Sequence, residues 1–312
     1  MDIKISVVIP CFNAEKFISH CLDSVVNQTY PPYEVIVCDD ASKDRTRDVI
    51  KEYQNKYPHL LKPIFQEKNA GSAINLNTGL KAATGNWIVR MDGDDLWTAD
   101  KLYHEVQKII ENPDIDVVYS DVMLISEDGK YLRPFRRKYD GSEGHILAEM
   151  LTHEMSFRDY LFRKEFVDRD GFFDPNIKMF RDWDHKIRLL STAKVGYVNK
   201  TTVCYRNRTG GMSKAGPGVY LESLEYIYKK HERLLSSIDS PLKKEILNRK
   251  YYDFWTFNTR IFRDALQSKK WKLLFITFYK MFKIKPHQSV SFILNVFRKK
   301  AVSVMKIRYF ER

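Results

Sequence analysis

The stretch that decides the fold is Trp87-Ile88-Val89-Arg90-Met91-Asp92-Gly93-Asp94-Asp95. Its first five residues are mostly apolar and predict a short buried strand, and three aspartates follow that strand almost at once. In an open parallel sheet, ligands bind at the carboxyl ends of the strands. A buried strand that ends in carboxylates therefore predicts a ligand site at one edge of a sheet.

Outward from this stretch, the first 110 or so residues alternate short apolar runs with amphipathic helical patterns. Such alternation is typical of βαβ units and predicts an α/β fold with a mostly parallel sheet flanked by helices. Ser42 and Thr98 are the predicted N-caps of the second and fourth helices. The predicted strands are 5–9, 34–38, 62–66, 87–91 and 116–124, and the predicted helices are 14–27, 43–57, 72–83 and 98–111.

Carboxylates follow two of the predicted strands, at Asp39-Asp40 and at Asp92-Gly93-Asp94-Asp95. Gathering like charges costs free energy unless a cation or hydrogen-bond donors compensate. A hard divalent cation takes oxygen ligands and also neutralises a diphosphate. The pattern thus favours a nucleotide-diphosphate site, and the alternative is that these aspartates only cap helices and turns.

Two Asn-x-Gly segments, Asn69-Ala70-Gly71 and Asn77-Thr78-Gly79, are predicted to frame the third helix. Their glycines permit a tight turn and a close approach to a ligand. The sequence contains neither GxGxxG nor GxxxxGK[ST], so a dinucleotide-binding fold and a P-loop are not supported.

Asp182 opens a predicted helix, so it is either a helix cap or a general base that reaches an acceptor hydroxyl. Farther along, Tyr205-Arg206-Asn207-Arg208-Thr209-Gly210-Gly211-Met212-Ser213 follows a predicted strand. This basic segment is either a loop that closes over a diphosphate leaving group or a solvated loop.

Taken in order, these segments resemble the family-2 inverting glycosyltransferases of the Rossmann-like GT-A fold. The matching segments are Val7–Glu15, Asp39–Asp44, Asn69–Gly79, Asp92–Asp94 and Asp182–Asp184, and the resemblance covers about residues 3–213. It implies inverting, metal-dependent transfer of a sugar from a nucleotide-sugar, by family preference a UDP-sugar, to an acceptor hydroxyl. The implied setting is the synthesis of cell-surface polysaccharide or of a lipid-linked glycan.

The resemblance also implies roles for individual residues. Asp94, together with Asp92, would ligate Mg²⁺ or Mn²⁺, which would stabilise the departing diphosphate as a Lewis acid. Asp182 would take the proton of the acceptor hydroxyl. The nucleotide-sugar contacts would be Pro10, Phe12, Asn13, Glu15, Asp39, Asp40, Asn69, Gly71, Asn77, Asp92, Gly93, Arg206 and Arg208. Asp40 is favoured over Asp39 for the contact with the nucleobase.

Three positions depart from the family's pattern. Leu76 is the nearest residue to a position before the second Asn-x-Gly segment at which the family often has an arginine. Arg181 stands where a glutamate often precedes the base aspartate, and Arg208 stands where the closing loop commonly has a histidine. The departure at Arg208 removes a potential metal ligand, although an arginine can itself contact phosphate.

The C-terminal third is predicted to be a separate, helical and basic region. Residues 1–214 form the predicted catalytic domain, with a nucleotide-sugar half over about 1–112 and an acceptor half over about 113–214. Residues 215–312 carry 21 Lys and Arg against 8 Asp and Glu, a balance of +13, whereas the whole chain has a net charge of +12. The excess positive charge therefore belongs to this region.

Within it, residues 271–284 are rich in aromatic and aliphatic residues, and near-helical apolar spacing resumes after Pro286. This pattern predicts that residues 268–312 contact an anionic membrane surface, and the alternative is packing against the catalytic domain. The apolar positions after Pro286 are Val290, Ile293, Val296, Phe297 and Val304, and the basic ones are Arg298, Lys299, Lys300, Lys306 and Arg308.

Location and partners follow from weaker signals. The cysteines at positions 11, 21, 38 and 204 are not spaced as CxxC and are expected to be free thiols in a reducing compartment. We find no apolar run of about 18 residues and no signal-peptide pattern. The expected location is the cytoplasm, peripheral on the inner face of the cell membrane, and no nucleic-acid partner is expected because no such motif accompanies the charge.

Two other functions compete with sugar transfer. A sugar-nucleotide pyrophosphorylase would need an early Gly-rich, basic loop, which Pro10-Cys11-Phe12-Asn13 does not provide. A catalytically silent nucleotide-sugar-binding or scaffold protein of the same fold is the alternative that gains support from Arg181 and Arg208.

Overall fold

The computed structural model describes residues 2–208 and 215–296. The chain divides into two compact units, Met1–Met212 and Ser213–Arg312. This division lies two residues before the predicted boundary at 214. The assignment of a donor half and an acceptor half within the first unit stays a prediction.

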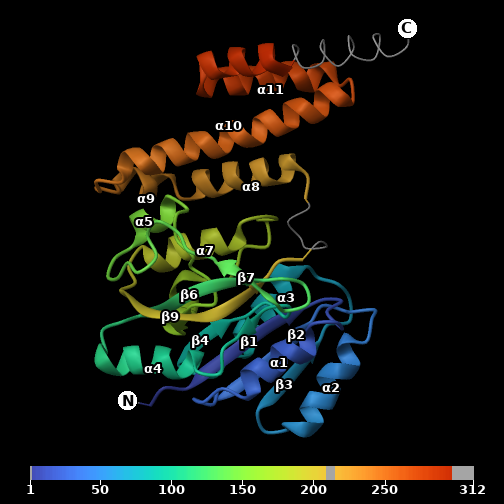
Figure 1. The fold of residues 1–312 in the computed structure, drawn as a ribbon, viewed down its shortest axis with the longest axis vertical. Helices are drawn as coiled ribbons and strands as arrows, with labels where there is room; N and C mark the ends of the chain where they lie inside the picture. Colours follow the sequence, from blue (N-terminus) through green and yellow to red (C-terminus); the bar gives the residue numbers. More distant parts are fainter. Residues whose placement is uncertain (1, 209–214, 297–312) are drawn as a thin grey trace. The chain divides into compact units, whose positions relative to one another are not determined.

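A nine-stranded sheet with helices on both faces forms the first unit (Figure 1). The strand order is β3-β2-β1-β4-β8-β6-β9-β5, and β7 pairs with β6. The α/β class is therefore confirmed. The strands are β1 Ile5–Cys11, β2 Glu34–Asp39, β3 Leu61–Phe65, β4 Trp87–Arg90, β5 Leu96–Trp97, β6 Val117–Ile125, β7 Tyr131–Pro134, β8 Leu161–Arg163 and β9 Val195–Arg206, and the helices are α1 Ile18–Val26, α2 Thr46–Lys56, α3 Ser72–Ala82, α4 Lys101–Glu111, α5 Leu147–Leu151, α6 Glu165–Asp170 and α7 Arg181–Leu190.

The sheet changes character at the pairing between β4 and β8. Strands β3, β2, β1 and β4 are all parallel, as predicted, and Val7 is in register with Val35 on one side and Val89 on the other. Beyond this seam β8 runs antiparallel to both β4 and β6, although β6 and β9 are again parallel. The predicted mostly parallel sheet thus describes the N-terminal half, and the remaining half is mixed.

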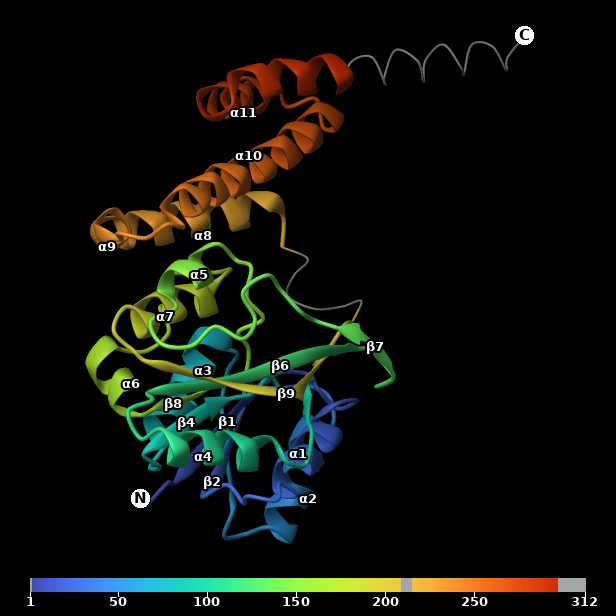
Figure 2. The same ribbon diagram turned by 60° about the vertical axis from the view of Figure 1, so that its left-hand side comes forward.

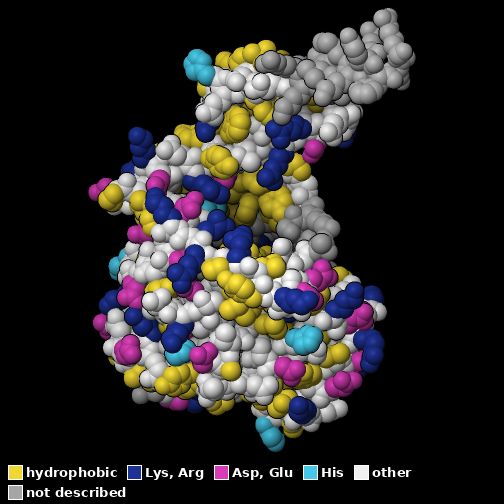
Figure 3. Space-filling view, viewed as in Figure 1, with side chains coloured by type: hydrophobic (Ala, Val, Ile, Leu, Met, Phe, Trp, Pro, Cys, Tyr) yellow, Lys and Arg dark blue, Asp and Glu magenta, His cyan; other side chains and the backbone are white. Residues whose placement is uncertain are grey.

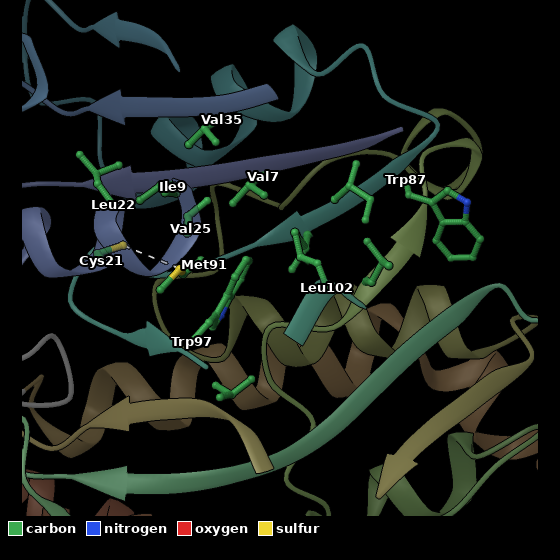
Figure 4. Packing of buried hydrophobic residues seen from close by; sticks show 14 of the residues in the cluster. Val7, Ile9, Cys21, Leu22, Val25, Val35, Trp87, Met91, Trp97 and Leu102 are labelled. Carbon is green, nitrogen blue, oxygen red and sulfur yellow. Dashed lines mark hydrogen bonds between the residues drawn. The ribbon is translucent and has the colours of Figure 1, made fainter. Parts of the chain in front are cut away.

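Alternation along β1 builds two cores. Side chains of a strand point alternately to opposite faces, and Ile5, Val7 and Ile9 belong to a core with α1, α2 and α4 (Figure 4). Val8 points to the other face, where α3 packs on β1 and β2. Both faces are covered, which is why β1 and β2 have near-continuous apolar sequences.

Two predicted helix caps are wrong. Helix α2 begins at Thr46 rather than Lys43, and α4 begins at Lys101 rather than Thr98. The Ser42 hydroxyl instead accepts a hydrogen bond from the Asn13 N–H at 2.8 Å, and the Thr98 hydroxyl donates to the Asp100 carboxylate at 2.6 Å. Both hydroxyls serve loop conformations, so the loops continue past the residues that have good capping chemistry.

The second Asn-x-Gly segment lies inside α3 and does not frame it. A Cβ added at Gly79 would lie 2.5 Å from Val8 Cγ1 and 2.7 Å from Cys38 Sγ. Gly79 therefore allows α3 to sit close to the sheet, and its small size serves packing rather than a ligand.

The second unit consists of helices α8 Pro217–Lys230, α9 Glu232–Ser237, α10 Lys243–Gln267 and α11 Trp271–Ile284 (Figure 2). Helix α10 packs against both α8 and α11. The backbone is also helical over 286–296, in the predicted amphipathic segment. The predicted positions Phe297, Arg298, Lys299, Lys300, Val304, Lys306 and Arg308 lie outside the described residues, as do residues 209–213 of the predicted closing loop.

A helix that crosses a bilayer must be both long and apolar. Within residues 2–208 and 215–296, no helix combines the length and the apolar character of a membrane span.

Candidate active site

Asp92 lies just beyond β4 and is held by two arginines. Arg90 Nη2 donates to Asp92 Oδ1 at 2.7 Å and to Oδ2 at 2.8 Å, and Arg158 Nη2 lies 3.3 Å from Oδ2. Burial by itself would raise the pKa of Asp92, but the charges of Arg90 and Arg158 outweigh burial and lower it. Asp92 is thus an ionised carboxylate in a fixed orientation.

The negative charge of the Asp94 carboxylate is less well compensated than that of Asp92. Arg208 Nε lies 2.6 Å from Asp94 Oδ2, and the Asp94 carbonyl accepts from Arg206 Nε at 2.7 Å. Burial and the neighbouring charge of Asp92 together raise the pKa of Asp94 in spite of Arg208. A second positive charge at Asp94 would therefore be stabilised.

The two carboxylates differ in their fitness for a divalent cation. Among the described residues, no group of three or more His, Cys, Asp or Glu side chains is arranged to hold a metal ion. Asp94 is about 20% exposed and has one arginine partner, so it fits as a single protein ligand to a metal whose other ligands come from a diphosphate. Both oxygens of Asp92 face arginines, which fits a role in orientation better than one in coordination.

Arg158 joins the aspartate segment to the rest of the site. Besides Asp92, it binds Asp95 Oδ2 at 2.9 Å, and its guanidinium lies 3.8 Å from the centre of the Tyr205 ring. Asp95 Oδ1 accepts from the Arg206 backbone N–H at 2.8 Å. These contacts fix the segment after β4 against the end of β9.

Asp182 lies in the first turn of α7. Its carboxylate is 3.0 Å from Lys186 Nζ, one helical turn later, and its side chain is 48% exposed. Burial of the carboxyl group would raise its pKa, but the charges of Lys186 and Arg90 reverse the shift and hold the pKa well below its usual range. Asp182 is therefore ionised and open to an incoming group.

Asp182 shares a pocket with three cationic side chains and several aromatic ones. Because Arg90 lines this pocket and also binds Asp92, it links the aspartate segment to α7. Behind the pocket wall, burial lowers the pKa of His185 to about 3, so the ring that stacks on Phe173 is neutral. The lining residues are Arg90, Phe157, Arg158, Asp159, Tyr160, Phe162, Phe173, Asp182 and Lys186.

At the end of β2, Asp39 and Asp40 have different surroundings. Both oxygens of Asp40 accept backbone hydrogen bonds, from the N–H groups of Ala70 at 2.8 Å and Gly71 at 2.9 Å. Asp39 Oδ2 accepts from Ser42 N–H and from Arg47, whereas its buried Oδ1 has no hydrogen-bond partner in the described part of the chain. Asp39 therefore retains a free acceptor, and Asp40 shapes the loop before α3.

The end of β1 supplies an exposed aromatic ring and a shaped turn. Phe12 is 47% exposed and lies just beyond β1, where a planar base could stack on it. Asn13 has a φ of 48°, and its side-chain oxygen accepts from the Lys43 N–H at 2.9 Å. Glu15 Oε2 accepts from the Arg45 N–H at 3.0 Å, and Pro10 is paired in register with Cys38. Asn13 and Glu15 thus tie the first strand end to the loop after β2.

Three of the predicted nucleotide-sugar contacts have structural roles instead. Asn77 and Arg206 bind backbone groups, and Gly93 serves packing. Asn77 exchanges two hydrogen bonds with the backbone of Phe173, at 2.8 and 2.9 Å, and so joins α3 to the segment before α7. The Arg206 guanidinium is buried against the carbonyls of Asp94, Ser126 and Glu127. Gly93 allows a close approach to β1, since an added Cβ would lie 3.1 Å from Cys11 Cβ.

The remaining predicted positions lie on the surface of the loop before α3. Asn69 is exposed, and Gly71 has a φ of 88°, in the region that favours glycine. The structure thus places Asp39, Asp40 and Gly71 together, whereas Asn77 belongs to a different contact.

Sequence reasoning missed the cations of the pocket. Lys186 follows Asp182 by four residues, which on a helix places the two side chains on one face. Arg90 lies two residues before Asp92 and places a charge at the end of an apolar strand, which was also a usable signal. Arg158 and Asp159 lie in a segment with little periodicity, so no local pattern indicated them.

Comparison with known proteins shows the family and the fold of this chain. The model of Glycosyl transferase family 2 matches residues 6–187. The Escherichia coli UDP-Glc:alpha-D-GlcNAc-diphosphoundecaprenol beta-1,3-glucosyltransferase WfgD is 34% identical over 142 residues, which cover 45% of this chain and 54% of WfgD. The chain spans between 36% and 60% of the length of the first five curated relatives it matches.

Two solved structures share the fold. TarS of Staphylococcus aureus, residues 1–349 in complex with UDP-GlcNAc, superposes with a TM-score of 0.68 at 22% identity, covering 93% of this chain and 83% of that one. The mannosyltransferase PcManGT of Pyrobaculum calidifontis, in complex with GDP-Man and Mn²⁺, gives a TM-score of 0.59 at 19% identity, with coverage of 94% and 86%. These likenesses confirm the GT-A fold. Because the family match spans more than half of the sequence, the chain belongs to glycosyl transferase family 2.

Proposed function

We propose that this chain transfers a sugar from a nucleotide-sugar to an acceptor hydroxyl with inversion at the anomeric carbon, and that Asp182 is its general base. The observation that carries the proposal is the pocket in which the half-exposed Asp182 carboxylate lies with Arg90, the arginine that also binds Asp92. Arg90 thereby connects the proposed general base with the carboxylate segment on the donor side.

For the donor, we propose a uridine diphosphate sugar. Phe12 offers a face for the base, and the free Oδ1 of the buried Asp39 offers an acceptor for an N–H or a ribose hydroxyl. Asp39, rather than the initially favoured Asp40, is therefore the proposed contact. WfgD is named for UDP-Glc and a TarS structure contains UDP-GlcNAc, which supports a UDP-sugar here.

Asp94 is the proposed ligand for Mg²⁺ or Mn²⁺, in line with the Mn²⁺ present in the PcManGT complex. When bound, the metal would neutralise the diphosphate and act on it as a Lewis acid. The chain's own contribution is to hold Asp94 at the site through Arg206, which binds its carbonyl, and to supply Arg208 as a further cation for phosphate oxygens.

The acceptor proton would move to a carboxylate oxygen of Asp182. The lowered pKa of Asp182 keeps that carboxylate ionised and ready to accept, but it also limits its basicity. A donor diphosphate that engages Arg90 would reduce the positive charge next to Asp182 and so raise its pKa when the base is needed. Asp159 is 7% exposed and receives a hydrogen bond from Trp97, so it does not compete for this role.

The proposed acceptor is a cell-surface or lipid-linked glycan. WfgD is named for a diphosphoundecaprenol-linked acceptor, which supports this class of molecule. Such a substrate suits a protein on the cytoplasmic face of a membrane. The competing function, a catalytically silent nucleotide-sugar-binding protein, predicts donor binding without turnover.

The variant Asp182→Asn tests the proposal. We expect it to bind UDP with Mn²⁺ as the parent does in calorimetry, because the amide keeps the side-chain shape, and to lose transfer by a factor of about 10² to 10⁴. The matched control is Asp168→Asn, an exposed aspartate on α6. Full turnover in Asp182→Asn would show that the base is another group, and absence of turnover in both parent and variant with any UDP-sugar would favour the silent protein.

A further inference from the structure

Helix α11 exposes an aromatic face that nothing within the described second unit covers. Trp271 is 70% exposed, Phe275 is 74% exposed and Tyr279 is 55% exposed. Leu274, Thr277 and Met281 are buried, on the side that packs against α10. The helix thus has one side in the core of the unit and a second apolar side in solvent.

The exposed residues form a continuous stripe. Trp271, Phe275, Tyr279 and Phe282 recur at intervals of three or four residues, which places them along one face of a helix. Surfaces of soluble proteins seldom carry several large neighbouring aromatic side chains at such exposure, and a patch of this kind marks an interaction site.

The charge that α11 and its flanking residues carry is positive, although one lysine, Lys280, pairs with Glu225 of α8 at 3.2 Å. Residues 265–296 contain no Asp or Glu, and hydrophobic and basic side chains are interspersed on the surface of this unit (Figure 3). Lys283 Nζ lies 5.4 Å from the centre of the Tyr279 ring, so charge and aromatic surface are adjacent. The lysines of this range are Lys269, Lys270, Lys272, Lys280, Lys283 and Lys285.

We propose that the α11 face, defined as Trp271, Phe275, Tyr279, Phe282 and their flanking lysines, binds the surface of an anionic lipid bilayer with the helix lying parallel to it. Aromatic residues partition into the region between headgroups and acyl chains, and lysines reach the lipid phosphates beside them. A nucleic-acid duplex, whose bases are already stacked on one another, would use the lysines but would leave the aromatic stripe in water. An acidic protein surface would likewise lack an apolar phase for four large rings.

Vesicle flotation with the full chain tests this inference. The probes are phosphatidylcholine vesicles and vesicles in which 30% of the lipid is phosphatidylglycerol. We expect flotation with the anionic vesicles at low salt, weaker flotation as salt screens the lysines, and little with neutral vesicles. Absence of flotation with the anionic vesicles at low salt would overturn the proposal.

Two double variants separate the α11 face from general hydrophobic adhesion. Trp271→Ser with Phe275→Ser should weaken anionic-vesicle binding by about tenfold or more, because both rings leave the interface. The matched control is Tyr131→Ser with Leu132→Ser on β7, which also removes two exposed apolar residues, 59% and 49% exposed, and should bind as the parent does. Equal binding by the α11 variant and the parent, with circular dichroism showing both folded, would overturn the assignment.

Trp271 also provides a direct spectroscopic reporter. Trp87, Trp97 and Trp183 are each at most 5% exposed and Trp255 is partly buried, so an emission change on vesicle binding should come from Trp271. We expect a blue shift with anionic vesicles that disappears in Trp271→Phe while flotation persists. If Trp271 were already shielded from acrylamide in the free protein, another segment or a second copy would cover this face, and the membrane assignment would be wrong.

Discussion

At the scale of single residues, the contact between Arg208 and Asp94 makes this site different from the pattern it otherwise follows. The guanidinium lies 2.6 Å from the carboxylate that we propose as the metal ligand, at a position where a histidine is common in the resembling family. An arginine cannot ligate a metal, and its charge repels one. Arg208 therefore competes with a divalent cation until a diphosphate offers it another partner.

Removal of this arginine should tighten metal binding in the absence of nucleotide. For Arg208→Ala we expect the affinity for Mn²⁺ alone to rise by about three- to tenfold, as removal of a partly exposed ion pair worth about 1 kcal/mol implies. Electron paramagnetic resonance titration of free Mn²⁺ measures this without reference to turnover. Arg133→Ala, which removes an exposed arginine on β7, is the control. Weaker Mn²⁺ binding in Arg208→Ala would contradict the competition.

The sequence could indicate Asp94 and Asp182 because each carries local information, one by following an apolar strand and the other by opening a helix. It could not indicate Arg158, because the contacts of that residue with Asp92, Asp95 and Tyr205 join segments about 50 to 65 positions apart. Nor could it separate Asp39 from Asp40, whose different hydrogen bonds depend on how the loop before α3 folds back.

At the scale of elements, Glu34 at the start of β2 joins four parts of the sheet and its loops. Its buried carboxylate accepts from the Ser6 hydroxyl on β1 at 2.6 Å, from Lys62 on β3 at 2.6 Å, and from the backbone of Thr84 at 2.6 Å. Burial would raise the pKa of Glu34, but these donors, Lys62 above all, lower it from 4.5 to about 2. The ionised form is thus preferred in the folded state.

Because the folded state prefers the ionised form of Glu34, this residue should stabilise the fold less as the pH falls. Because the folded-state pKa lies below the unfolded value, the contribution of Glu34 is complete above about pH 4.5 and disappears as the pH falls toward 2. We expect Glu34→Gln to lower the free energy of unfolding by about 2 kcal/mol at pH 7, allowing for solvent screening of the half-exposed Lys62, and by much less near pH 2.5. Urea denaturation at both pH values measures this, with the exposed Glu67→Gln as control, and a penalty that does not depend on pH would contradict it.

A pair of helical glycines allows a second element-scale prediction. Gly79→Ala in α3 should destabilise the chain by about 1–3 kcal/mol, because the new methyl group would overlap Val8 and Cys38 of the strands below. Gly218→Ala in α8 adds the same methyl group where no atom lies within 4 Å, and it should be neutral or stabilising by up to about 1 kcal/mol. Chemical denaturation of both variants gives the comparison. Equal effects would show that α3 can move away from the sheet.

Element prediction from sequence succeeded where the hydrophobic period was strong. Apart from the two-residue strand β5, the strands and helices from β1 to α4 were predicted with boundary errors of a few residues, because each of them buries a continuous face. Between β6 and β9 the elements are short, for example β8 with three residues and α5 with five. A period cannot be read from so few positions, so β8, which reverses the sheet, was not predicted.

At the scale of the whole molecule, all proposed donor contacts lie in the unit Met1–Met212 and none in Ser213–Arg312. A ligand stabilises the structure that binds it by mass action, about 2.7 kcal/mol at a hundred times its dissociation constant. In scanning calorimetry, UDP with Mn²⁺ should therefore raise the melting temperature of the first unit and leave that of the second unit unchanged. One transition that moves as a whole would show that the two units unfold together.

The seam between β4 and β8 has a consequence for how this protein can diversify. On one side of it, parallel strands are connected through helices; on the other, strands of mixed direction alternate with irregular segments, and Arg158, Arg206 and Arg208 reach from there to the aspartates after β4. Grafting the segment after the seam from a relative should therefore exchange what receives the sugar, and it should preserve donor binding only where these three arginines are kept. A boundary between two pairing directions thus becomes a natural splice point for new specificities.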